Sequence, residues 1–239
     1  AAYTAVDRAE DEIEAAYATN GFGAAWLAAE SRRLGIPMVH VSTDYVFSGD
    51  GSGFRSEDSP VAPTSVYGAS KLAGEIAVLA ATDCAAIVRS AWIVSPHRSN
   101  FLKTMLRLAG ERDEISVVAD QRGCPTVAAD LARALQVIVL RLLDDPGAPT
   151  GIFHFVNSGE ASWAELAEVI MHEAQANGLP AAKIVPVPSS AYPTKVARPA
   201  DSRLSTERLN RDYGIRPRPW QEAVTATVRE VARRGQRTT

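Results

Sequence analysis

Hydrophobic and polar positions along this chain fall into two kinds of segment, Ala-rich amphipathic stretches and short runs of β-branched residues. The first kind predicts helices and the second predicts buried strands. We expect helices at residues 15–34, 66–81, 100–110, 127–143, 162–176 and 221–234. We expect strands at 38–42, 85–89, 115–118 and 152–156, and a Gly/Ser/Asp/Pro-rich loop at 48–63. Strands that alternate with helices predict an α/β fold with a parallel sheet covered on both faces.

Local signals refine two of these helices. Ser162 and Glu165 have the spacing of a capping box, which predicts a helix that begins directly after Ser162. Three tryptophans, Trp26, Trp163 and Trp220, fall in helical stretches, and we expect all three to lie in the core.

Composition limits the class of protein. The chain has 239 residues, 46% hydrophobic and 22% charged, which suits one large domain or two small ones. No apolar run approaches the ~20 residues of a membrane helix, which excludes a transmembrane protein. The net charge of −3, with both signs interspersed, argues against a nucleic-acid-binding surface. Cys84 and Cys124 are too few for a disulfide framework, and neither they nor the four histidines show metal-ligand spacing, so a reducing cytoplasm and no metal site are expected.

Candidate chemistry begins with Tyr67 and Lys71, which lie four residues apart and therefore on one face of the helix expected at 66–81. An ammonium group near a phenol favours the phenolate and lowers the tyrosine pKa, as a general acid in carbonyl reduction requires. An ordinary pair on the surface of an amphipathic helix is the alternative.

A second candidate lies at the end of the strand expected at 38–42. Ser42 and Thr43 follow that strand, at the carboxyl edge where open α/β sheets bind ligands. The Thr43 hydroxyl can donate a hydrogen bond to a substrate carbonyl. The alternative is that both hydroxyls only cap the turn into the loop.

Together, Thr43, Tyr67 and Lys71 resemble the Ser/Thr–Tyr–Lys triad of the extended short-chain dehydrogenase/reductase superfamily. The flanking sequence is similar to the dTDP-4-dehydrorhamnose reductase family nearly from end to end. The matching segments are residues 1–7, 42–47, 67–75, 89–92, 100–101, 120–121, 125–126, 198–199 and 202–204.

The resemblance implies a Rossmann-like doubly wound parallel sheet with a smaller C-terminal α/β substrate lobe. Residues 1–95 and 126–158 would form the NAD(P)-binding domain, and residues 96–125 and 159–239 the nucleotide-sugar-binding lobe. The glycine-rich phosphate loop of the family would precede Ala1. We therefore expect a fragment with an N-terminally incomplete sheet, which alone binds NAD(P)H poorly.

The implied activity is that of an oxidoreductase: NADPH-dependent reduction of the C4 ketone of dTDP-4-dehydro-6-deoxy-L-mannose to dTDP-L-rhamnose. This reaction belongs to dTDP-rhamnose biosynthesis, which supplies cell-wall polysaccharide and lipopolysaccharide O antigen. NADH is the alternative cofactor. Another nucleotide-sugar 4-ketoreductase or epimerase, and a non-catalytic regulatory subunit on the same fold, remain open alternatives. The implied partners are a nucleotide sugar and a second copy in a homodimer, in the cytoplasm, with no nucleic acid and no membrane.

The resemblance also implies roles for individual residues. Tyr67 would protonate the C4 oxygen, Lys71 would hold the nicotinamide ribose and tune Tyr67, and Thr43 would orient the carbonyl. The other implied cofactor-binding residues, at a strand end, are Ala2, Tyr3 and Thr4. The implied substrate-binding residues are Thr4, Val6, Tyr45, Trp92, Arg198 and Arg203.

Two further positions bear on these implications. Asn20 matches the structural asparagine of the superfamily. Some members bind Mg²⁺ through carboxylates, but Ala129 stands where a Glu is expected, so the sequence does not support a Mg²⁺ site.

Overall fold

The computed structural model describes residues 2–51 and 53–236. Contacts divide the chain into two compact units. The first unit consists of Ala1–Ser90, Ala132–Phe155 and Thr194–Arg216, and the second of Ala91–Leu131, Val156–Pro193 and Pro217–Thr239.

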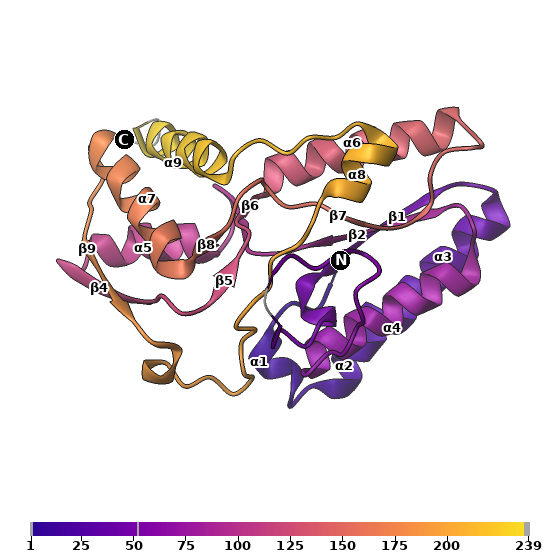
Figure 1. Cartoon of the computed structure of the whole chain (residues 1–239), viewed down its shortest axis with the longest axis horizontal. Helices are drawn as coiled ribbons and strands as arrows, with labels where there is room; N and C mark the ends of the chain where they lie inside the picture. The colour runs from indigo at the N-terminus through magenta and orange to yellow at the C-terminus, as the bar shows by residue number, and fades with distance from the viewer. Residues whose placement is uncertain (1, 52, 237–239) are drawn as a thin grey trace. The chain divides into compact units, whose positions relative to one another are not determined.

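The first unit is built on a three-stranded parallel sheet. Its strands are β1 (Met38–Thr43), β2 (Ala85–Ser90) and β7 (Gly151–His154), in the order β1-β2-β7. All six residues of β2 are buried, because this strand lies between the other two and is covered by helices. Helices α3 and α4 lie on one face of the sheet and α6 on the other (Figure 1). The predicted parallel α/β arrangement is confirmed.

The first unit contains the helices expected at 15–34 and 66–81 and most of the one expected at 127–143, together with short helices at Val6–Ala9 and Glu207–Tyr213 that were not expected. Its helical elements are α1 (Val6–Ala9), α2 (Ile13–Tyr17), the π-helical turn η1 (Ala18–Phe22), α3 (Gly23–Leu34), the 3-10 turn η2 (Asp44–Val46), α4 (Val66–Ala81) and α8 (Glu207–Tyr213), with residues 132–144 of α6 (Ala128–Asp144). The helix expected at 15–34 is therefore a run of α2, η1 and α3. Trp26 on α3 is 72% exposed, so the expected core position is wrong: this helix buries only Ala24 and Ala28.

The segment at 194–216 belongs to the first unit by its contacts, whereas the division expected from the sequence placed it in the lobe. Its backbone pairs with the loop at 48–63, which has no helix or strand among its described residues. Arg55 N donates to Arg203 O at 2.8 Å, and Ser205 N donates to Arg55 O at 2.8 Å. These bonds attach the late segment to the early loop.

The second unit holds three small strand pairs. Two are parallel, β3 (Ile93–Val94) with β6 (Thr126–Val127) and β4 (Glu114–Val118) with β9 (Lys183–Val187), and β5 (Arg122–Gly123) with β8 (Ala161–Ser162) is antiparallel. Its helices are α5 (Phe101–Ala109), α7 (Trp163–Ala176), α9 (Trp220–Gln236) and the short η3 (Ser189–Ala191). Apolar side chains of α5, α7 and α9 pack into one core.

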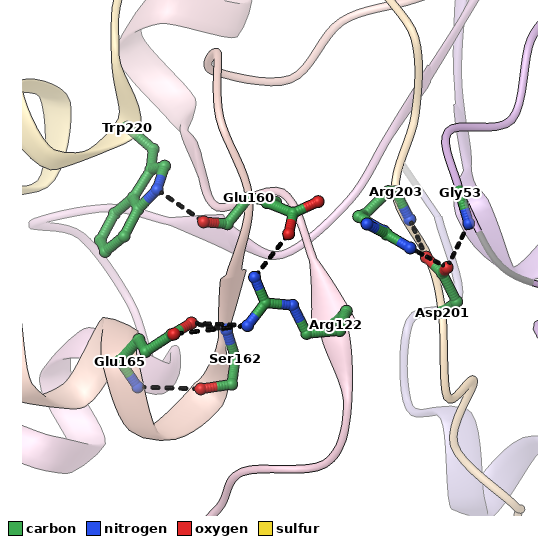
Figure 2. A network of polar contacts seen from close by, with 8 residues as sticks. All are labelled: Gly53, Arg122, Glu160, Ser162, Glu165, Asp201, Arg203 and Trp220. Carbon is green, nitrogen blue, oxygen red and sulfur yellow. Dashed lines mark hydrogen bonds and ion pairs between the residues drawn. The ribbon is translucent and has the colours of Figure 1, made fainter.

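The start of α7 shows the predicted capping box. Glu165 N donates to Ser162 Oγ at 3.1 Å, and Ser162 N donates to the Glu165 carboxylate at 2.6 Å. Arg122 forms ion pairs with Glu165 at 3.0 Å and with Glu160 at 2.6 Å (Figure 2). Trp220 is buried as expected, and its indole nitrogen donates to Glu160 O at 3.1 Å.

None of the helices in the described part of the chain is both long and apolar enough to span a membrane.

Candidate functional site

The carboxyl end of β1 carries a group of buried polar side chains. Thr43 is 5% exposed, and its hydroxyl donates to Asp44 Oδ1 at 2.9 Å while it accepts from Tyr45 N at 3.3 Å. The hydroxyls of Ser42 on β1 and Ser90 on β2 are buried without a hydrogen-bond partner. Unpartnered buried hydroxyls at the carboxyl edge of a parallel sheet fit a polar ligand, because such groups otherwise carry a desolvation cost.

Helix α4 brings Tyr67 and Lys71 to this edge. Ser65 caps the helix by accepting from Gly68 N at 3.1 Å. A Cβ at Gly68 would lie 2.2 Å from Tyr45 O, so only glycine lets the first turn of α4 approach the residues that follow Thr43. The rings of Tyr45 and Tyr67 then meet edge to face, 5.4 Å apart.

Tyr67 has a perturbed acidity. Burial raises its pKa to about 12, hydrogen bonding with the Thr43 side chain opposes this, and the Asp44 charge adds to it. The expectation that Lys71 lowers the pKa of Tyr67 is wrong for this structure. Lys71 is 4% exposed, and its ammonium group donates to Val41 O at 2.6 Å instead.

Other titratable groups near the triad are also shifted. Burial lowers the pKa of Lys71, and burial together with the Lys71 charge lowers the pKa of His40 to about 4. The His40 Nε2 atom lies 3.5 Å from Lys71 Nζ. Burial raises the pKa of Asp44 to about 6, against hydrogen bonds from Thr43 and Ser202 that lower it. The edge of β1 is therefore a region of low polarity with several ionisable groups.

The N-terminal segment is attached to α4 through Asn20. The Asn20 amide accepts from Tyr3 N at 2.9 Å and donates to Tyr3 O at 3.1 Å and to Ser70 Oγ at 3.0 Å. Residues 2–5 form no strand, and Ala2 and Thr4 are exposed. Ala1 lies outside the described residues.

The arginines expected near a diphosphate both have carboxylate partners. Arg198 forms an ion pair with Asp7, which follows Val6 at the start of α1. Burial and the Asp44 charge raise the pKa of Tyr45 to about 12, against the charge of Arg198 and a hydrogen bond with it, which lower it. This places Arg198 beside the aromatic pair of Tyr45 and Tyr67.

Arg203 binds a different carboxylate. Its guanidinium group donates to both oxygens of Asp201, at 2.9 and 2.6 Å, and Gly53 N donates to the same carboxylate at 2.8 Å (Figure 2). The guanidinium carbon also lies 5.5 Å from the centre of the Phe54 ring. A bidentate pair of this kind holds the guanidinium plane in a fixed orientation.

Trp92 belongs to the second unit. Its backbone has a φ of 47°, and its ring is stacked on Trp163 with 3.6 Å between ring centres and 10° between planes. Trp163 is only half-buried, so the expected core position holds in part. No cluster of three or more His, Cys, Asp or Glu side chains suited to a metal ion occurs in residues 2–51 and 53–236.

Sequence reasoning did not single out the carboxylates that position several of these groups. Asp44 is adjacent to Thr43, Asp7 is adjacent to Val6, and Asp201 is two residues from Arg203. Each lies in or next to a segment that carried the family resemblance. That proximity is the only signal in the sequence that points to these carboxylates. Which hydroxyl or guanidinium group each carboxylate contacts is a property of the fold.

A parallel sheet with a threonine at a strand end, followed by a helix that presents Tyr and Lys one turn apart, defines the class of short-chain dehydrogenase/reductase-like proteins. Comparison with known proteins agrees. A family model described as "RmlD substrate binding domain" matches residues 1–233. A dTDP-4-dehydrorhamnose reductase of Sinorhizobium fredii is 44% identical over 229 residues, which cover 95% of this chain and 77% of the relative.

Two further relatives extend the comparison. A spore coat polysaccharide biosynthesis protein of Bacillus subtilis is 44% identical over 230 residues, covering 96% of this chain and 77% of that protein. The crystal structure of dTDP-4-dehydrorhamnose reductase from Bacillus anthracis in complex with NADP is 37% identical, with a TM-score of 0.88 and coverage of 96% and 78%. The chain therefore belongs to the dTDP-4-dehydrorhamnose reductase family, and the predicted resemblance and Rossmann-like fold are confirmed.

Proposed function

We propose that this chain reduces the C4 ketone of dTDP-4-dehydro-6-deoxy-L-mannose with NADPH and releases dTDP-L-rhamnose. The observation that carries the proposal is the grouping of Thr43, Tyr67 and Lys71 at the carboxyl edge of β1. It is supported by relatives at up to 44% identity that are named dTDP-4-dehydrorhamnose reductase, one of them solved with NADP.

The reduction adds a hydride to C4 and a proton to its oxygen, and NADPH supplies the hydride when it is bound. Burial raises the pKa of Tyr67 to about 12, so the phenol is protonated at neutral pH and carries the proton that the C4 oxygen takes up. The raised pKa makes the phenol a weaker acid, but the alkoxide formed at C4 is a stronger base than the phenolate.

The Thr43 hydroxyl lies next to the phenol and donates its one proton to Asp44 in this structure. With substrate bound, that proton turns from Asp44 to the C4 oxygen and polarises the carbonyl. Lys71, whose ammonium group donates to Val41 O at 2.6 Å in this structure, would hold the nicotinamide ribose.

The remaining roles are part of the same proposal. Residues 1–95 and 126–158 form the cofactor domain and residues 96–125 and 159–239 the nucleotide-sugar lobe. The cofactor contacts come from Ala2, Tyr3, Thr4, Tyr67 and Lys71, and the sugar nucleotide contacts from Thr4, Val6, Tyr45, Trp92, Arg198 and Arg203. The two arginines exchange their carboxylate partners for the diphosphate, a substitution that the fork geometry of guanidinium favours.

The proposal extends to assembly and location. Cys84 and Cys124 are both free thiols, which supports a cytoplasmic location, whereas the homodimer is proposed from the family resemblance. Sedimentation of the purified protein tests the dimer, and cell fractionation tests the location.

The decisive experiment compares Tyr67→Phe with the parent protein by NADPH oxidation, with and without dTDP-4-dehydro-6-deoxy-L-mannose. Loss of a positioned general acid is expected to lower turnover by about 10²–10⁴-fold. NADPH binding is expected to stay within about twofold, because the hydroxyl is small compared with the whole cofactor interface.

Tyr213→Phe is the matched control, since its hydroxyl donates to Pro149 O, outside the site. Equal loss of turnover and NADPH binding in Tyr67→Phe contradicts the assignment of Tyr67. Turnover only with a different nucleotide sugar identifies another ketoreductase, and absence of NADPH binding identifies the regulatory alternative.

A further inference from the structure

Trp92 has a backbone conformation that bulky residues rarely adopt. Its φ of 47° lies in the left-handed region, where a side chain with a Cβ is disfavoured. The backbone is nevertheless fixed, because Thr126 N donates to Trp92 O at 3.1 Å and the next residue, Ile93, pairs with Thr126 between β3 and β6. Backbone strain that the surrounding structure maintains is concentrated at functional sites.

The Trp92 ring is held from one side by the start of α7. Trp163 is the first residue of that helix, directly after the capping box, so its ring position is determined by the helix start. Its indole is parallel to that of Trp92 within 10°, and Phe101 packs against it with 4.7 Å between ring centres. Trp163 is therefore stacked on Trp92 and in tilted contact with Phe101.

Gly123 on β5 supplies the second contact. A Cβ built on this residue would lie 2.3 Å from Trp92 Cε2 and 2.6 Å from Nε1, distances that real contacts do not show. Any side chain at this position would displace the indole. Gly123 pairs with Ala161 on β8, two residues before Trp163, so both contacts come from one strand pair and the helix that follows it.

Both Trp92 and Trp163 remain only half-buried. A rigid indole with open surface provides apolar area at low entropic cost, and it suits the C–H face and the methyl group of a 6-deoxy sugar. A loosely held indole would have to be ordered by each ligand, which weakens binding.

We propose that Gly123 and Trp163 are positioning residues that hold the Trp92 indole as a fixed platform for the sugar ring of the nucleotide sugar. The link to the sugar rests on the proposed function, whereas the effect of both residues on the Trp92 ring does not. Because neither residue carries a group that can transfer a proton, they act on binding of the sugar nucleotide and leave the chemical step nearly unchanged.

The test compares Gly123→Ala, Trp163→Leu and Trp163→Phe with Gly110→Ala. Gly110 ends α5 with a φ of −78°, which alanine adopts freely, so it controls for the gain of a methyl group in the same unit. The first readout is the exciton couplet that stacked indoles give in far-ultraviolet circular dichroism. The second is the Kd of dTDP-L-rhamnose by calorimetry, and the third is the split between KM and kcat.

We expect Gly123→Ala and Trp163→Leu to lose the couplet and to raise both Kd and KM for the sugar nucleotide about tenfold, the loss of one aromatic contact. Values of kcat and of KM for NADPH should stay within about twofold. Trp163→Phe loses the indole couplet but keeps a stacking ring, so it should restore Kd to within about threefold of the parent.

An unchanged couplet in Gly123→Ala overturns the positioning role, as does an unchanged Kd in both Gly123→Ala and Trp163→Leu once the couplet is lost. A protein that binds dTDP-L-rhamnose but turns over no ketone contradicts the proposed function alone. If Gly123→Ala does not fold, the comparison of Trp163→Leu with Trp163→Phe tests whether a ring stacked on Trp92 is needed for binding of dTDP-L-rhamnose.

Discussion

The two units differ in where they keep their charges. In the first unit, ionised or ionisable side chains lie in the interior: Glu75 and Arg89 are 1% and 2% exposed and form a bidentate pair at 2.6 and 2.9 Å. Lys71, one helical turn before Glu75 on α4, and Asp44, directly after β1, are buried as well. In the second unit the core cluster is apolar, and the buried carboxylates of Asp130 and Glu173 pair with partly exposed arginines. The ion pair of Arg122 with Glu165 also lies partly exposed.

This difference suits the two units to different tasks, proton transfer in the first and ligand recognition in the second. A low-polarity interior strengthens electrostatic interactions and shifts pKa values, which proton transfer requires. An apolar core whose buried carboxylates pair with partly exposed arginines supplies rigidity and shape, which recognition of a ligand requires. Matched substitutions in the two units test this difference.

The largest effect is expected from Glu75→Ala. It leaves the Arg89 guanidinium buried without its carboxylate, and Arg89 Nη1 already lacks a partner. We expect the free energy of unfolding to fall by about 3–5 kcal/mol, measured by urea denaturation. Glu114→Ala is the control in the second unit, because its pair with Lys183 is largely exposed and should contribute less than about 1 kcal/mol. An equal fall in the free energy of unfolding in both variants would contradict the difference between the two units.

The next effect concerns pH. Burial and the nearby charge of Arg89 lower the pKa of His154 to about 3, so the folded state keeps this imidazole neutral. The unfolded chain binds the proton below its ordinary pKa of 6.5, so stability is present above that pH and is lost as pH falls. Between pH 6.5 and about pH 4 the loss should be about 3 kcal/mol.

His154→Phe tests this expectation, because it keeps a ring against Phe47 and cannot take up a proton. Urea unfolding at both pH values should show a smaller difference for the variant than for the parent. His97→Phe serves as the comparison in the second unit, where His97 is exposed. An identical pH dependence in His154→Phe and the parent would contradict burial as the cause.

The smallest effect compares two helix caps. Ser65→Ala removes the cap of α4 and Ser162→Ala the cap of α7, and each should lower the free energy of unfolding by about 1 kcal/mol. Only Ser65→Ala should also lower kcat, because Tyr67 lies in the turn that Ser65 caps. Denaturation and NADPH oxidation on both variants check this, and a kcat that falls as much in Ser162→Ala would place the chemistry elsewhere.

Much of the fold could be predicted because its signals are local. The bounds of α4 and the capping box of α7 follow from helical periodicity and cap residues. The two-residue strands β3, β5, β6 and β8 could not be predicted, since two residues show no periodicity. Strand β9 contains Pro186, which indicated a break in the chain, but β9 pairs only with β4 in its sheet and therefore tolerates proline.

The candidate site was predictable in its members and not in its electrostatics. The strand end at Thr43 and the helical spacing of Tyr67 and Lys71 indicate that these groups meet. The pKa of Tyr67, and the bond from Lys71 to Val41 O, depend on burial and on backbone positions that no spacing records. Trp92 shows the same limit, because its φ and its contact with Gly123 arise from pairing between distant segments.

The attachment of the loop at 48–63 to the segment around Arg203 has a consequence for synthesis of the protein. Gly53 and Asp201 are separated by 148 positions, and residues between them form most of the second unit. At ribosomal rates of about 5–20 residues per second, the loop emerges on the order of ten seconds before its partner. During that interval the nascent chain exposes an early loop without its backbone partners. The first unit therefore reaches its native state only after translation has passed through most of the second.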